Sequence, residues 1–269
     1  MITLIGHGYV GNNISRTLDF KCIPYNWISH KESIPQSTTS IINAAGYTGS
    51  PNVDACEIHK QETIDGNVVY SLQLELNNPN TPIVHISSGC VYTGYKEGGF
   101  TEEDEPNFNF NNGSFYSGAK ALQQKLLMPY MNKSFLLRIR MPFGDEDHPK
   151  NLLTKLKKYS KLISYDNSLS YLPDVAAFAI ALTGKTFPTG IYNVCNPGFS
   201  NAKKIIQMMN LNKEFFTEDE FIQSVTAPRS NCILNTNKIQ SVFPIRSVDE
   251  ALKMACLLYT SPSPRDATL

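Results

Sequence analysis

The chain has 269 residues, of which 41% are hydrophobic, enough for one large α/β domain or for a domain with a smaller lobe. Lysine plus arginine equals aspartate plus glutamate at 24 each, and this zero net charge argues against a nucleic acid or membrane surface held by bulk charge. No apolar run reaches the roughly 20 residues of a membrane span, and the amino terminus lacks a signal-like core, so we expect a cytoplasmic protein.

Short apolar segments alternate with helical patterns along the first half of the chain. Apolar runs predict strands at 1–5, 23–28, 40–44, 82–87 and 135–139. Helical periodicity predicts helices at 9–20, 52–76 and 114–128, the last stopped by Pro129. Strands that alternate with helices predict an α/β fold built on a doubly wound parallel sheet.

The second half of the chain has a different pattern of predicted elements. From residue 142 the loops lengthen, and Pro, Asn and Ser separate short helices and strands. We therefore predict a cofactor-binding domain at 1–141 and a smaller, mainly substrate-binding lobe at 142–255 that returns a strand or two to the sheet. Residues 256–269 change character abruptly and resemble a translated sequencing adapter, so we predict a non-native tail there.

The six cysteines and five histidines are scattered along the chain. Without a CxxC pair, the cysteines are interpreted as reduced thiols. The histidines show no HxxxH spacing and no carboxylates at ligand spacing, so no metal site is expected.

The first loop reads GxGxxG, with glycines at Gly6, Gly8 and Gly11. Between a strand and a helix, the first glycine permits a tight turn, the second lets a pyrophosphate approach the backbone, and the third lets strand and helix pack closely. The helix amino terminus then offers NH groups to the phosphates. The motif predicts a Rossmann-type dinucleotide site, with a ligand-free glycine turn as the alternative.

The candidate cofactor-binding residues follow the first three predicted strands. They are Gly6, Gly8, Tyr9, Val10, Gly11, Ser29, Lys31, Ala44 and Ala45. A site for NAD usually has an acid after the second strand for the ribose 2′-hydroxyl, but no acid precedes Glu32 here. Ser29, His30 and Lys31 could instead receive a 2′-phosphate, which favours NADPH over NADH, although a solvated loop would have the same composition.

Tyr116 and Lys120 lie one helical turn apart on one face of a predicted helix. A tyrosine with a reference pKa of ~10 is a poor proton donor at neutral pH, and a neighbouring lysine and an oxidised nicotinamide both lower that pKa. Ser88 ends the preceding strand and could hold a substrate oxygen beside the phenol. The order of GxGxxG, Ser88 and YxxxK predicts a reductase, and an ordinary surface helix is the alternative.

These motifs resemble the extended short-chain dehydrogenase/reductase family over residues 1 to about 255. The segments that carry the resemblance are 43–57, 87–92, 100–108, 113–120, 137–142, 151–156, 190–198 and 227–231. Within the family, the series is similar to the bifunctional UDP-4-keto-6-deoxyglucose 3,5-epimerase/4-reductases of UDP-rhamnose synthesis and, more distantly, to the dTDP-4-dehydrorhamnose reductases.

The resemblance implies an NADPH-dependent enzyme that epimerises a nucleoside-diphosphate 4-keto-6-deoxy sugar at C3 and C5 and reduces it at C4. It implies that Cys90 is the base and Lys155 its partner acid, that Tyr116 donates a proton to oxygen, and that Lys120 holds the cofactor ribose. From the residues alone, Cys90 is either a base beside Ser88 or a small buried hydrophobe. Lys155 belongs to a basic run that would ordinarily be a solvated face.

Arg229 and Asn151 are the remaining substrate-binding candidates, beside Ser88. A guanidinium can pair with the substrate diphosphate in bidentate fashion, and a surface ion pair is the alternative for Arg229. Two rival functions stay open: a 4-ketoreductase with an inert Cys90, and a non-catalytic regulatory subunit on the same fold. Members of the family often dimerise through the helix that carries Tyr116, so a homodimer is one expectation for an oligomeric state that the sequence leaves open.

Overall fold

The centre of the molecule is a parallel β-sheet. The computed structural model describes residues 1–184 and 186–260. Six strands lie in the order β2-β1-β3-β4-β5-β9, and every pairing is parallel. Their bounds are β1 Ile2–Ile5, β2 Tyr25–Ile28, β3 Ser40–Asn43, β4 Ile83–Ser88, β5 Phe135–Ile139 and β9 Gly190–Asn193. The predicted α/β fold is confirmed.

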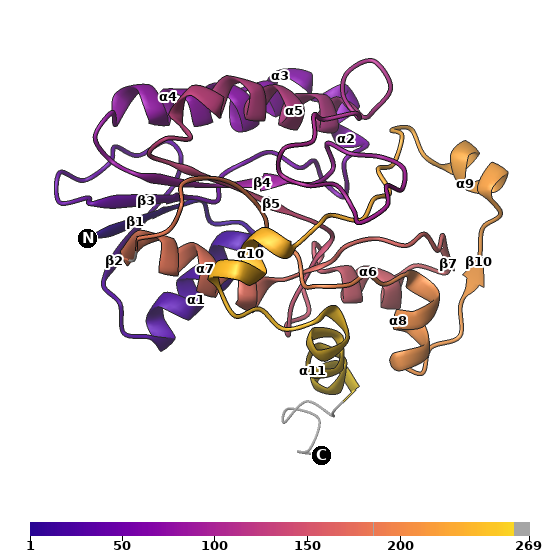
Figure 1. Ribbon diagram of the computed structural model, residues 1–269. Helices are drawn as coiled ribbons and strands as arrows, with labels where there is room; N and C mark the ends of the chain where they lie inside the picture. The colour runs from indigo at the N-terminus through magenta and orange to yellow at the C-terminus, as the bar shows by residue number, and fades with distance from the viewer. Residues whose placement is uncertain (185, 261–269) are drawn as a thin grey trace.

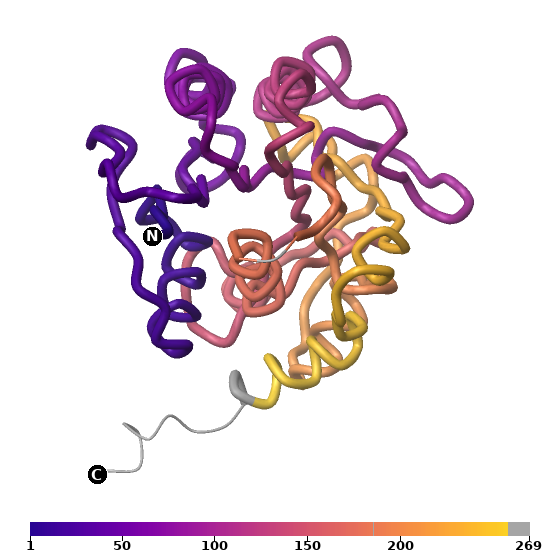
Figure 2. Tube along the Cα trace, turned by 60° about the vertical axis from the view of Figure 1, so that its left-hand side comes forward, coloured from indigo at the N-terminus to yellow at the C-terminus, as the bar shows by residue number. Residues whose placement is uncertain are grey.

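Helices cover both faces of this sheet, which is why β1, β3, β4 and β5 are buried along their whole length. On one face lie α2 (Ala55–Ile58), α3 (Lys60–Ile64), α4 (Tyr70–Asn77) and α5 (Phe115–Leu127), and on the other α1 (Tyr9–Phe20) and α7 (Leu172–Gly184) (Figure 1). Figure 2 shows the two helical layers on either side of the strands.

The apolar faces of α1 and α7 pack together against the sheet. Ile14 and Leu18 of α1 and Phe178 of α7 are fully buried in one hydrophobic cluster with Leu4 of β1. Each such side chain contributes about 1.5–3 kcal/mol by leaving water. This packing fixes the β1–α1 turn at the carboxyl edge of the sheet.

The strand order places a crevice beside β1. The chain passes from β1 to β2 on one side and then to β3 on the other, so the loops after β1 and β3 diverge. In open α/β sheets, ligands bind at such a switch point, outside the carboxyl ends of the strands. Gly6 follows β1 and Ala44 follows β3 at this edge.

The single helix predicted over 52–76 is broken in the structure. His59, with φ −92° and ψ 60°, separates α2 from α3, and a π turn, η1 (Asp65–Val69), separates α3 from α4. The π turn lies where the amide of Asn67 donates to the carbonyl oxygens of Tyr47 and Thr63. Periodicity alone does not reveal such interruptions, because the apolar spacing on either side stays helical.

The chain after residue 141 builds a second core and also completes the sheet. Its elements are β6 (Pro142–Phe143), α6 (Leu152–Lys158), β7 (Lys161–Leu162), β8 (Ser170–Tyr171), α8 (Ala202–Met208), β10 (Glu214–Phe215), α9 (Glu218–Ser224), α10 (Asn237–Val242) and α11 (Val248–Thr260), and the short η2 (Met128–Tyr130) precedes β5. Leu153, Ile205 and Leu252 pack in this second core. Since β9 joins the main sheet and α7 packs against it, residues after 142 also belong to the first core. The domain boundary at 142 stays a prediction.

The helix α11 crosses the predicted start of the tail. Cys256 is 4% exposed and packs with Leu252 in the second core, because the apolar face of α11 continues past residue 255. The tail predicted from residue 256 therefore overlaps a packed helix in its first residues, and the part at 261–269 lies outside the described residues. Within the described ranges, no helix is long and apolar enough to cross a membrane.

Candidate active site

The glycine turn between β1 and α1 packs against the loop that follows β3. Gly6 has φ +103°, and a Cβ built on it would lie 2.7 Å from the backbone nitrogen of Ala45. A Cβ on Gly11 would collide with the carbonyl oxygen of Gly6. Gly8, in contrast, has open space around the position of a Cβ, with no atom within 4 Å. The turn is therefore tight on its protein side and open on its crevice side.

The amino terminus of α1 faces this open side without a side-chain cap. Gly8 is the N-cap residue, and as a glycine it has no side chain to cap the first turn of α1. Uncapped NH groups and the helix dipole favour an anion at this point. The predicted residues Tyr9, Val10, Ala44 and Ala45 lie around the same turn, so the residues present fit the pyrophosphate of a dinucleotide.

The loop after β2 carries the residues predicted to determine the preference for NADPH over NADH. Lys31 is exposed, and its backbone NH donates to the Ser29 hydroxyl at 3.4 Å. The carboxylate of Glu32 folds back and accepts from the NH of Ser29 at 2.7 Å. This hydrogen bond is the main reason that the pKa of Glu32 is lowered. A lysine and a carboxylate thus both flank the end of β2.

Helix α5 carries Tyr116 and Lys120 into the protein rather than onto its surface. Ser114 caps the helix by accepting from the NH of Ser117 at 3.0 Å, and Glu57 accepts from the NH of Phe115 at 2.7 Å. These contacts start the helix so that Tyr116 is 8% and Lys120 3% exposed. The lysine nitrogen lies 6.0 Å from the centre of the tyrosine ring.

Burial shifts the pKa values of Tyr116 and Lys120 in opposite directions. It raises the pKa of Tyr116, as does the nearby Cys90, while a hydrogen bond with Ser88 lowers it in part. It lowers the pKa of Lys120 to about 8. Ser88, at the end of β4, is 6% exposed. The structure therefore brings the predicted serine, tyrosine and lysine together as one cluster.

Gln123 is a member of this cluster that the sequence did not single out. Its amide oxygen accepts from the Lys120 ammonium at 3.2 Å and from the Ser87 hydroxyl at 2.9 Å. Its amide nitrogen donates to Ser71 at 2.7 Å. The available signal was its place one helical turn after Lys120, on the same inward face of α5.

Cys90 is half-buried in the turn that follows β4, and its backbone NH donates to the Ser88 hydroxyl at 3.1 Å. The guanidinium of Arg140, directly after β5, donates to its sulfur at 2.9 Å. Sequence reasoning did not select Arg140. The thiol lies near enough to Tyr116 and Lys120 to affect the pKa of both.

Lys155 and Arg229 belong to a second, cationic group of residues. Lys155 is partly buried, and its pKa is lowered by burial and then by the charges of Lys150 and Arg229. Arg229 forms a bidentate pair with Asp54, at 2.9 and 2.7 Å. Burial would raise the pKa of Asp54, but the hydrogen bonds from Arg229 and from the NH of Ala227 lower it overall.

The ion pair predicted as the alternative for Arg229 is therefore present, and Lys150 is a further cation that the sequence did not single out. The Lys150 ammonium donates to the carbonyl oxygen of Gly49. Its charge also opposes the effect of burial on Cys56, whose pKa is raised. Cys56 in turn raises the pKa of Tyr116, so its charge state is felt by both the cationic group and the serine–tyrosine–lysine cluster.

Asn151 is fully buried at the start of α6. Its oxygen accepts from the NH of Leu153, and its nitrogen donates to the carbonyl oxygens of Gly144 and Glu146 at 2.9 and 2.7 Å. The side chain is the N-cap of the helix that carries Lys155. Any influence of Asn151 on a substrate would pass through the position of that helix.

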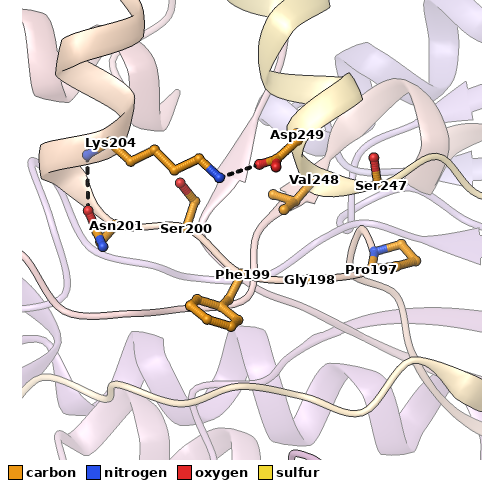
Figure 3. Close-up of a pocket in the computed structure, with 9 residues that line it drawn as sticks. All are labelled: Pro197, Gly198, Phe199, Ser200, Asn201, Lys204, Ser247, Val248 and Asp249. Carbon is orange, nitrogen blue, oxygen red and sulfur yellow. Dashed lines mark hydrogen bonds and ion pairs between the residues drawn. The ribbon is translucent and has the colours of Figure 1, made fainter.

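A hollow of about 310 Å³ lies away from these residues, between the loop at 197–201 and the start of α11 (Figure 3). Lys204 and Asp249 form an ion pair of 2.6 Å at its edge. None of the predicted site residues lines it. A smaller hollow of about 70 Å³ borders α6 and includes Asn167 and Asn231 in its wall.

The parallel sheet, the glycine turn after β1 and the inward-facing serine, tyrosine and lysine define a Rossmann-type reductase fold. Within that class, the chain belongs to the family described as RmlD substrate binding domain, which matches residues 30–259. The resemblance to rhamnose-type reductases predicted from the sequence is confirmed.

Individual relatives agree with this assignment. The chain is 34% identical over 270 residues to a bifunctional dTDP-4-dehydrorhamnose 3,5-epimerase/dTDP-4-dehydrorhamnose reductase of Arabidopsis thaliana, covering 91% of this chain and 88% of that protein. The crystal structure of the L780 UDP-rhamnose synthase of Acanthamoeba polyphaga mimivirus matches with a TM-score of 0.85 at 26% identity, over 96% of this chain and 99% of that chain. A dTDP-4-dehydrorhamnose reductase of Bacillus anthracis in complex with NADP shares the fold, with a TM-score of 0.79 at 20% identity over 95% and 98% of the two chains.

Proposed function

We propose that this protein is an NADPH-dependent 4-ketoreductase of nucleoside-diphosphate 4-keto-6-deoxy sugars that also epimerises the carbons beside the keto group. The product would be an NDP-rhamnose or a related 6-deoxyhexose. The observation that carries the proposal is the half-buried thiol of Cys90 in the same cluster as Ser88, Tyr116 and Lys120. The names of the relatives, which include epimerase/reductases and a UDP-rhamnose synthase, support it.

The residues that would hold NADPH lie along the carboxyl edge of the sheet. The open side of Gly8 and the uncapped start of α1 suit the pyrophosphate, Ser29 and Lys31 the 2′-phosphate, and Lys120 the nicotinamide ribose. When bound, NADPH supplies the hydride that reduces C4. NADH stays an alternative, because Glu32 also reaches the end of β2.

In the reduction, the protein's own residues place the ketone and deliver a proton. The Ser88 hydroxyl donates a hydrogen bond to the C4 oxygen, and the phenol of Tyr116 transfers its proton to that oxygen as the alcohol forms. Burial raises the pKa of Tyr116 and so keeps the phenol protonated beforehand. Lys120, fixed by Gln123, stabilises the phenolate that remains.

In the epimerisation, Cys90 removes a proton from a carbon next to the C4 ketone. The electron pair of that C–H bond moves into an enolate, whose oxygen is stabilised by Ser88 and Tyr116. Lys155 then gives a proton to the opposite face of the same carbon, which inverts it. A lowered pKa, caused by burial and by Lys150 and Arg229, makes Lys155 a better proton donor than an exposed lysine. Arg229 and its neighbour Lys150 would face the diphosphate.

The two halves of the proposal separate experimentally. UDP- or dTDP-4-keto-6-deoxyglucose is incubated with the protein in deuterated water without NADPH, and NMR follows deuterium entering C3 and C5. Cys90→Ser should slow this exchange at least about 100-fold, as loss of a general base does, whereas the exposed Cys22→Ser should leave it unchanged.

Addition of NADPH then tests the reduction. Cys90→Ser should still oxidise NADPH with an already epimerised 4-keto sugar, since Ser88, Tyr116 and Lys120 remain. Undiminished exchange in Cys90→Ser would refute Cys90 as the base, and an unaltered protein that catalysed no exchange would be a plain 4-ketoreductase. If the unaltered protein oxidised no NADPH with any nucleotide keto sugar, a regulatory subunit on this fold would be the better reading.

A further inference from the structure

Arg140 is a buried cation whose charge needs a partner. Its residue is 3% exposed, directly after β5. Among the residues that the structure describes, no aspartate or glutamate forms an ion pair with it. A charge removed from water needs a compensating charge or a full set of hydrogen bonds. Since one nitrogen of this guanidinium, Nε, is buried without a hydrogen-bond partner, the neutral acceptors around it do not complete that set.

The neutral acceptors lie on one side of the guanidinium. Nη2 donates to the side-chain oxygen of Asn167 and to the carbonyl oxygen of Ser230. On the other side, Nη1 donates to the sulfur of Cys90 at 2.9 Å. Asn167 and Ser230 thus orient the planar group so that its remaining arm points at the thiol.

The register of the sheet produces this contact. β4 and β5 are neighbouring parallel strands, and Ser88 pairs with Ile139 at their carboxyl ends. The residues that follow, Cys90 and Arg140, therefore leave the sheet side by side. Gly89, between Ser88 and Cys90, packs against Leu234 and Arg140, because a Cβ there would lie 2.6 Å from the Leu234 side chain and 3.5 Å from that of Arg140.

Three sulfur atoms surround the guanidinium, and they are not equivalent. Cys195 and Cys232 are fully buried, and burial raises the pKa of both, that of Cys195 to about 12. Cys90 is half-buried and makes the direct 2.9 Å contact. It is therefore the sulfur that combines a direct contact with Nη1 of Arg140 and access from the solvent.

We propose that Arg140 is a positioning residue that holds Cys90 as a thiolate, with the sulfur serving as the counter-charge of the buried guanidinium. The inference deepens the proposed function, because it says how the base of the epimerisation is kept ready. It does not depend on that function for its test, since a thiolate has a reactivity of its own.

The other titratable groups that face Cys90 are Tyr116 and Lys120 of α5 and the thiol of Cys232. Burial and then an anionic sulfur raise the pKa of Tyr116, and so the resting enzyme keeps its phenol proton for the reduction. Lys120 adds a second positive charge near the sulfur, while its own hydrogen bond goes to Gln123. Arg140 is the cation in direct contact.

The first test measures the unaltered protein without substrate. Iodoacetamide alkylates Cys90 and the exposed Cys22, and peptide mass spectrometry gives each rate as a function of pH. An ordinary thiol of reference pKa ~8.5 becomes about 75-fold more reactive from about pH 6.5 to about pH 9. A thiolate at residue 90 should change less than about threefold over the same range. A profile at Cys90 that rises as an ordinary thiol does would overturn the proposal.

The second test removes or moves the charge. Arg140→Met should restore a steep pH profile at Cys90 and slow its alkylation near pH 6.5 at least about tenfold, while Arg140→Lys, which keeps a cation, should restore part of the flat profile. Circular dichroism and thermal melting check that each variant folds. A folded Arg140→Met with the flat profile of the unaltered protein would refute the role of Arg140. Should Arg140→Met not fold, the profile of the unaltered protein decides by itself.

The same variants separate this inference from the proposed function. Deuterium exchange at C3 and C5 reports whether Cys90 acts as the base, and alkylation reports whether it is ionised. A flat alkylation profile in a protein without exchange would keep the thiolate and discard the epimerase. Exchange in a protein whose Cys90 has an ordinary thiol profile would keep the epimerase and discard the thiolate.

Discussion

The alkaline limit of ketone reduction should belong to Lys120. Burial lowers the pKa of Lys120 to about 8 and raises that of Tyr116. The form with a lysine ammonium and a protonated phenol therefore exists below about pH 8, and it is lost as the pH rises through the pKa of Lys120. We expect kcat/KM to fall by about tenfold per pH unit above that point, since this parameter follows the free enzyme.

Gln123→Glu should move this limit. The amide oxygen of Gln123 accepts from the Lys120 ammonium at 3.2 Å, and both side chains are almost fully buried. Glutamate has nearly the same shape and puts a negative charge at that oxygen. An opposite charge this close raises the pKa of a lysine by about one to three units, each unit corresponding to about 1.4 kcal/mol. The midpoint should therefore shift from about 8 to between about 9 and about 11.

The assay is the pH dependence of kcat/KM from the absorbance of NADPH, with a matched control on the same helix. Gln124, the next residue, is 8% exposed and accepts from Nε of Arg138 at 3.0 Å, so Gln124→Glu adds the same charge away from Lys120. The control should keep its midpoint near 8. If Gln123→Glu kept it as well, the alkaline limit would not arise from Lys120, and the assignment would fall.

Three further substitutions test the cofactor and substrate contacts. Gly8→Ala fits the backbone and meets no atom within 4 Å, so the melting temperature should stay within about 4 °C while the Kd for NADPH, measured by its fluorescence, rises at least about tenfold; Gly184→Ala, equally open but remote, should leave both unchanged. Lys31→Ala should lower kcat/KM for NADPH about five- to tenfold and leave NADH unaffected, and equal losses with both would contradict a 2′-phosphate contact. Arg229→Leu should raise KM for the nucleotide sugar about 10–100-fold without a change in KM for NADPH, and an unchanged sugar KM would reduce Arg229 to its ion pair with Asp54.

Local features of the chain were readable in advance. The GxGxxG turn is one continuous stretch of sequence. Each of its glycines is explained by what a Cβ at that position would meet, a clash at Gly6 and Gly11 and open space at Gly8. Tyr116 and Lys120 share a face because any α-helix brings residues four apart together. Short apolar runs predicted a parallel sheet, because the strands of such a sheet are buried on both faces and are apolar along their length. Short-range geometry depends little on the rest of the fold.

The contacts of the candidate site could not be predicted from such local patterns. Arg140 meets Cys90 across 50 positions of sequence, and Asp54 meets Arg229 across 175. The first pairing depends on the register of β4 against β5, and the second on where the loop after α9 returns. No periodicity in the sequence predicts either contact, because packing brings together side chains from different elements.

The sequence by itself determined the fold class, the dinucleotide turn and the order of Ser88, Tyr116 and Lys120, since these follow from backbone geometry and the spacing of neighbours along the chain. Only the tertiary structure decided which charges face one another. It paired Cys90 with the buried guanidinium of Arg140, placed Lys155 beside Lys150, and used Asn151 as a helix cap. Electrostatic energy depends on distance and burial in space, and the folded chain sets both.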